Sequence, residues 1–210
     1  GTVKTGTRVG GPASRCRAVT LRVRSEGVGV TMMGRTHALS GAVLGLAVCS
    51  AVPPPPVLVP VVVVVCALAA FAPDLDHPSS VAARSLPPVT WLLCRAIRWL
   101  SRVTTGVSHR GLSHSPVFAA AVGLLAWWGT GFLLSGETAV WTGGAAGAGC
   151  WVGAIGDELT SNGNRFAFWP LEGIRWPRAL RFRTGGTGEH VVVGLLAVTG
   201  VALITGTWAF

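Results

Sequence analysis

SPVFAAAVGLLAWWGTGFLL, residues 115–134, decides the fold class of this chain. These 20 residues carry no charged side chain, which is the length and composition of a helix that crosses a bilayer. Ser115 is suited to cap such a helix and Pro116 to occupy its first turn. The whole chain is 50% hydrophobic and 12% charged, where soluble domains carry roughly 25% charged residues. The sequence therefore predicts a membrane protein.

Four further apolar runs flank this stretch, and all are compatible with membrane helices. Two short ones lie on either side of the break PPPP at 53–56. Each has about 16 residues, covering roughly 24 Å of a roughly 30 Å hydrocarbon core, so we expect a tight or partly re-entrant hairpin. A later run contains GGAAGAG, which permits close contact between helices. The prediction is an all-α, polytopic bundle of about five membrane helices, from apolar runs at 37–52, 57–72, 115–134, 139–155 and 191–210.

The segment WLLCRAIRWLSRV, residues 91–103, has a different character. Arg95, Arg98 and Arg102 fall on one face at helical spacing, while Leu92 and Trp99 lie largely away from them. This pattern is typical of a basic amphipathic helix in the membrane interface. The alternative is a cytoplasmic helix that packs on the bundle.

The distribution of charge sets the predicted orientation. If the chain crosses at each run, every Lys and Arg lies on the same side as the N-terminus, and the opposite loops hold only Glu137. The positive-inside rule makes that side the cytoplasm, so we expect a multi-pass protein of the inner membrane with a cytoplasmic N-terminus. Topology thus accounts for the net charge of +9, and no direct nucleic-acid partner is expected.

Two units are expected along the chain. Residues 1–33 are basic and glycine-rich without the apolar core of a signal peptide, and are interpreted as a disordered leader or an upstream extension ahead of Met32 or Met33. Residues 34–210 form the membrane domain. The cysteines form no CxxC pair, and four of the five are expected to be small core residues.

The five histidines all lie beside helix ends on the predicted cytoplasmic side, and so do most acidic residues. Ionisable groups at such positions are costly unless they are paired, solvated or bound to an ion. A lone interfacial histidine is usually solvated, and PDLDH alone is compatible with a helix stop. The coincidence of PDLDH, HRGLSH and GDELT on one face favours a shared metal site, with candidate ligands His37, Asp74, Asp76, His77, His109, His114 and Asp157.

Mixed imidazole and carboxylate ligands suit a divalent transition metal, zinc first and manganese or iron next. Asp76 and Asp157 are the candidate catalytic residues. One of them would act as the general base or would orient a metal ligand. Thr160 is a candidate supporting partner of Asp157. Glu158 and Glu172 are interpreted as solvated loop charges.

The ordered motifs resemble a known family. They are THALSG at 36, PDLDHP at 73, HRGLSHS at 109, GDELTSNG at 156, FWP at 168 and RTGGTGEH at 183. Together they are similar to the LexA-binding, inner-membrane-associated metal-dependent hydrolase family (YdjM-like). The resemblance implies a helical membrane enzyme and marks the seven candidate ligands as motif positions.

One position departs from the family pattern, in which a histidine stands four residues before the aspartate of GDELT. Here that position is Gly153. Either His190 takes the place of this ligand in space, or the chain binds metal weakly or not at all.

The leading functional hypothesis is hydrolysis by metal-activated water at the cytoplasmic face, on a phosphoester or lipid substrate. The alternative is a non-catalytic, membrane-docked protein that binds a cytoplasmic regulatory partner, as the family's LexA-binding name implies. In both cases the lipid bilayer is a partner.

Overall fold

The computed structural model describes residues 27–160, 166–169, 171, 177 and 181–207, and within them the chain is helical without strands. This confirms the all-α class. The elements are α1 (Gly27–Ala51), η1 (Pro56–Leu58), α2 (Val59–Ala69), η2 (Ala72–Asp76), α3 (Val81–Arg84), α4 (Val89–Thr105), η3 (Leu112–His114), α5 (Pro116–Gly131), α6 (Gly136–Glu158) and α7 (Thr187–Thr207).

All five apolar runs form helices, but their lengths differ from expectation. Two segments are long and apolar enough to cross a membrane, Pro56–Asp76 with 21 residues and Thr187–Gly206 with 20. The second run is therefore longer than predicted, because the 3-10 turns η1 and η2 extend α2 at both ends. The strongest predicted span is shorter: α5 has 16 residues and ends at Gly131, where the chain turns back.

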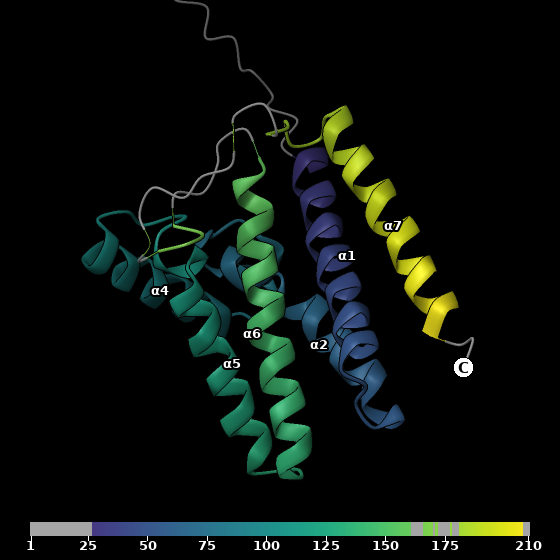
Figure 1. The fold of residues 1–210 in the computed structure, drawn as a ribbon. Helices are drawn as coiled ribbons and strands as arrows, with labels where there is room; N and C mark the ends of the chain where they lie inside the picture. Colours follow the sequence, from purple (N-terminus) through teal and green to yellow (C-terminus); the bar gives the residue numbers. More distant parts are fainter. Residues whose placement is uncertain (1–26, 161–165, 170, 172–176, 178–180, 208–210) are drawn as a thin grey trace, which may run out of the picture.

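The long helices form a layered bundle. Helices α7, α1, α6 and α5 lie side by side in Figure 1, and α2 packs against α1 and α6. Glycines allow the backbones to approach, as GGAAGAG predicted. A Cβ on Gly143 of α6 would lie 2.6 Å from the Cβ of Trp127 on α5, and one on Gly149 would meet the carbonyl oxygen of Cys66 on α2.

Caps and cysteines agree with the sequence. The Ser115 hydroxyl accepts a hydrogen bond from the Phe118 N–H at 3.2 Å, with Pro116 opening α5. The four cysteines among the described residues are buried and free. Most of the predicted leader lies outside the described residues, and α1 begins at Gly27, ahead of the predicted boundary at Gly34.

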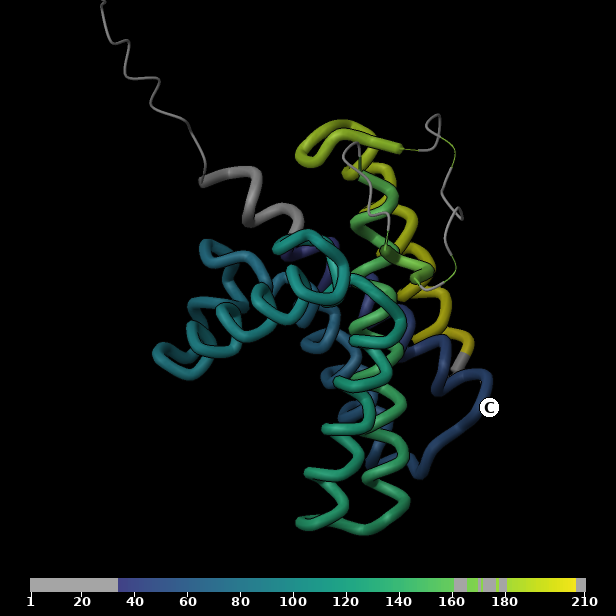
Figure 2. Tube along the Cα trace, turned by 90° about the vertical axis from the view of Figure 1, so that its left-hand side faces the viewer, coloured from purple at the N-terminus to yellow at the C-terminus, as the bar shows by residue number. Residues whose placement is uncertain are grey.

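Helix α4 lies outside the row of long helices. It packs on η2, η3 and α3, and Figure 2 shows it projecting sideways across the long axis of α5 and α6. It ends at Thr105 and is capped by Gly106, whose φ of 74° is a left-handed conformation that glycine adopts without steric cost. The turns η2 and η3 contact each other and α6, and the part of α1 around His37 lies beside them at the same end of the bundle.

Candidate metal centre

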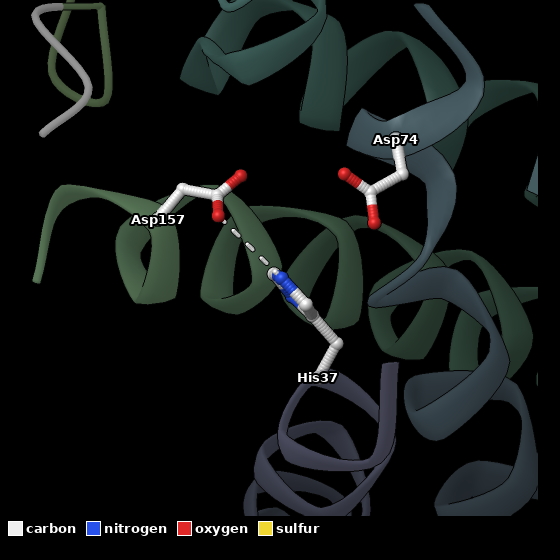
Figure 3. Close-up of side chains that lie close together, drawn as sticks. All are labelled: His37, Asp74 and Asp157. Atoms are coloured by element: carbon white, nitrogen blue, oxygen red, sulfur yellow. Dashed lines mark ion pairs between the residues drawn. The ribbon is translucent and has the colours of Figure 1, made fainter. Parts of the chain in front are cut away.

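Three side chains from separate parts of the chain meet at this end. His37 belongs to the first helix, Asp74 to the turn η2, and Asp157 to the last turn of α6. One ligand atom from each lies within 4.8 Å of the other two. Figure 3 shows the two carboxylates facing each other across a gap, with the imidazole of His37 reaching towards them from α1.

Local hydrogen bonds hold the two aspartates in place. The hydroxyl of Ser80 donates to the backbone carbonyl of Asp74 at 2.7 Å, which ties η2 to the start of α3. Thr160 donates to the backbone carbonyl of Asp157 at 2.8 Å. Thr160 is thus a partner of Asp157, as the sequence predicted, but it supports the helix end and not the carboxylate.

Asp157 is the most heavily contacted carboxylate of the trio. His114 Nε2 lies 2.8 Å from its Oδ2, while Arg110 Nη2 and His37 Nε2 lie 3.3 and 3.6 Å from its Oδ1. Asp157 stands at the polar end of α6, past the apolar residues. Burial alone would raise its pKa, but the contacts with His114 and His37 hold that pKa well below its ordinary value.

Asp76 lies outside the trio and has a different environment. Its side chain is fully buried, and both oxygens accept hydrogen bonds from the loop before α5. The donors are His109 Nδ1 at 2.7 Å, the Arg110 backbone N–H at 2.9 Å and the Ser113 hydroxyl at 2.6 Å. Asp76 therefore organises the HRGLSH loop.

Arg110 and Ser113 are further parts of the site, and neither is among the candidate ligands named from the sequence. Arg110 has a φ of 54°, a left-handed conformation that is uncommon for a residue with a Cβ. Asp76 holds its backbone while its guanidinium reaches Asp157. Ser113 links Asp76 to His114, since its oxygen also lies 2.9 Å from His114 Nδ1. Their position between His109 and His114 was the available signal.

The remaining predicted residues occupy the edge of the cluster. His77 is exposed, with Nδ1 2.8 Å from the Ser79 hydroxyl and its ring centroid 5.0 Å from that of His109. Partial desolvation lowers the pKa of His77, and electrostatic repulsion from the neighbouring His109 adds to this effect. His190 is exposed and its Nδ1 contacts the Gly186 carbonyl at 2.9 Å, so it does not replace the missing family histidine.

The burial of Glu158 contradicts a prediction from the sequence. Glu158 was expected to be a solvated loop charge, but it is 1% exposed and pairs with Arg181 at 2.8 Å. It follows Asp157 in the last turn of α6, so burial of that turn encloses both side chains. Glu172 lies outside the described residues.

The donor set of the trio fits a divalent transition metal. One imidazole nitrogen and two carboxylate oxygens are ligands that zinc, manganese and iron accept, and three protein ligands leave room for water. No described residue donates a hydrogen bond to the Asp74 carboxylate, which is half-buried and faces the other two ligands. A partly buried carboxylate without donors is suited to a cation.

The comparisons with known proteins agree with the membrane character of the fold. The model of the YdjM inner membrane protein family matches residues 32–209. The chain belongs to this family. No match was found among curated proteins or among solved structures.

Membership of the YdjM family, together with the two apolar segments of membrane length, establishes association with the inner membrane. The matched region contains all seven candidate ligands. It also contains Gly153, where a Cβ would meet the backbone carbonyl of Ala70, the residue that caps the end of α2. In this YdjM protein the glycine that stands in place of the family histidine is therefore a point of close packing between two helices.

Proposed function

We propose that this protein is a membrane-bound, metal-dependent hydrolase whose site is formed by His37, Asp74 and Asp157. The observation that carries the proposal is the convergence of three ligand atoms within 4.8 Å, one of them on a carboxylate that accepts no hydrogen bond from the described residues. Three ligands with an open position are typical of catalytic metal sites.

A bound ion would supply a water of lowered pKa and polarise a carbonyl or phosphoryl oxygen. The chain's own residues would do the rest. His114 orients Asp157 through the 2.8 Å contact, and Asp76 orients the loop that carries His114. Asp74 is the trio's carboxylate with most access to water, and we assign it the role of proton acceptor. This assignment replaces Asp76, whose oxygens are occupied.

The position of Arg110 favours an anionic substrate. Its side chain is 22% exposed and its guanidinium lies beside Asp157, so a phosphate or carboxylate group next to the trio would lie within its reach. Arginine is well suited to bind such groups through two parallel hydrogen bonds. Phosphoesters, including lipid phosphoesters, are therefore the substrate class we propose.

A second candidate function is favoured by the same arginine. Arg110 and His114 already contact Asp157, so this carboxylate is compensated without an ion. A polar cluster of that kind can serve as a structural junction in a membrane-docked protein that binds a cytoplasmic partner.

Metal analysis separates the two candidates. We expect the detergent-purified chain to contain near-stoichiometric zinc, manganese or iron by plasma mass spectrometry, and His37→Ala to lose most of it. His190→Ala is the matched control, because His190 is exposed and outside the trio, and it should retain the metal. The wild type should also release phosphate from phosphoester lipids in mixed micelles, with His37→Ala inactive. Equal metal contents in folded wild type and His37→Ala would favour the second candidate, a structural junction. So would the absence of metal from the wild type after reconstitution.

Metal occupancy should also depend on pH. Asp157 stays ionised well below its ordinary range, so the group that takes up protons first on acidification is an imidazole. Burial opposes protonation of His37, but its contact with Asp157 raises its pKa above the ordinary value of about 6.5. Because only neutral imidazole binds a metal, occupancy should begin to fall at a pH above about 6.5 and continue to fall as the pH drops further. Equilibrium dialysis over this range, with His37→Ala as the baseline, measures the effect. A constant occupancy would place His37 outside the coordination sphere.

A further inference from the structure

Helix α4 presents three distinct faces. One face is buried against the rest of the protein and carries Thr90, Cys94 and Ser101. A second carries Arg95 and Arg102, both exposed. The third is apolar and also exposed: Leu92 is 58% accessible, and Trp99 and Val103 are both 66% accessible. The buried face explains how α4 attaches to η2 and η3, but it leaves the apolar face without a partner among the described residues.

The arrangement excludes a membrane crossing for this helix. Its 17 residues cover about 25 Å, and the exposed arginines would have to enter the hydrocarbon core. Helix α4 also runs across the long axis of α5 and α6, not along it (Figure 2). If the long helices cross the bilayer, α4 therefore lies close to the plane of its surface.

We propose that α4 binds the surface of an anionic lipid leaflet, with the apolar face among the acyl chains and the arginine face at the headgroup phosphates. Charge complementarity favours this occupant, because the exposed stripe is basic and basic residues near an anionic leaflet are attracted to its headgroups. The arginine stems are long enough to reach headgroups while the helix sinks to the acyl boundary. The exposed apolar surface of α7 supplies a second membrane contact, on the opposite side of the bundle from α4 (Figure 1).

The same helix is connected to the candidate metal centre. Arg98, which lies between the buried and basic faces, donates from Nη1 to the backbone carbonyl of Asp76 at 3.3 Å. Lipid binding by α4 would therefore hold the HRGLSH loop at headgroup depth. The lipid contact itself does not require a metal in the site.

Site-specific photocrosslinking tests the proposal on the full chain in nanodiscs. The photoreactive residue p-benzoylphenylalanine is placed at Val103 or at Arg102, which are neighbours in sequence but lie on different faces. Val198 of α7, 70% accessible, is the positive control. In nanodiscs of phosphatidylcholine with phosphatidylglycerol, we expect lipid adducts at 103 and 198, and a several-fold lower yield at 102.

The role of charge is tested by lipid composition. The adduct yield at 103 should be several-fold higher with phosphatidylglycerol than with phosphatidylcholine alone, and Arg95→Gln with Arg102→Gln should remove the difference. Absence of lipid adducts at 103 beside normal adducts at 198 would overturn the proposal, as would an adduct with the mass of two chains. Equal yields in both lipids would overturn the anionic specificity. Each preparation is checked for folding by its elution profile, and metal-free protein should behave identically.

Discussion

Asp76→Ala is expected to destabilise the polar end of the bundle by about 3–5 kcal/mol, the usual cost of removing one partner from a buried charged network. The substitution leaves His109 Nδ1, the Arg110 N–H and the Ser113 hydroxyl without their acceptor. The left-handed backbone of Arg110 also loses its restraint. Thermal unfolding in detergent and hydrogen exchange of residues 107–115 should both report the loss.

Asp74→Ala is the matched control for this prediction. The two aspartates are two residues apart in η2, but the described residues donate no hydrogen bond to the side chain of Asp74. We expect its replacement to abolish metal binding, and to leave the unfolding temperature nearly unchanged when both proteins are compared free of metal. Asp76→Asn keeps one acceptor oxygen and should fall between the two. Equal stability of Asp74→Ala and Asp76→Ala would contradict the separate roles given to Asp74 as a metal ligand and to Asp76 as the carboxylate that organises the loop.

Gly153→His, which restores the family histidine, is expected to destabilise the protein and to add no metal ligand. A Cβ at this position would lie 3.0 Å from the carbonyl carbon of Ala70 and closer still to its oxygen, so α6 and α2 would have to separate. Overpacking of this kind typically costs about 1–3 kcal/mol, and here the obstacle is backbone.

Gly144→His provides the comparison on the same helix, because nothing lies within 4 Å of a Cβ at Gly144. The unfolding temperature should fall for Gly153→His and stay near that of the wild type for Gly144→His. Metal content should rise in neither. A stable Gly153→His variant with tighter metal binding would show that α2 and α6 separate easily and that the family ligand set is recoverable.

The sequence predicted the helices because hydropathy alone carries that information. The run at 37–52 lies within α1 apart from Val52, and the described part of the run at 191–210 lies within α7. Residues 91–103 form most of α4. The error in α5 has a local cause: the stretch remains apolar past Gly131, but the helix ends there, and composition does not record a change of direction.

The gathering of the motifs at one end was also predictable, because each motif adjoins a helix end. The separate roles of the ionisable side chains at that end were not predictable. Asp74 and Asp76 lie in one 3-10 turn, whose side-chain directions depend on how η2 docks against α4 and η3. Glu158 shares this difficulty, since its burial depends on Arg181, which is 23 residues further along the chain.

The trio draws its members from α1, η2 and α6, and this has a consequence for biosynthesis. A growing chain contains no site until residue 157 has been made and α6 has packed against the two earlier elements. Helix α7 follows later and packs mainly on α1, where Glu189 accepts a hydrogen bond from Thr36, the neighbour of His37, at 2.6 Å. Insertion of the last helix therefore closes a structure whose charged centre already exists, and the Thr36 contact fastens α7 beside it.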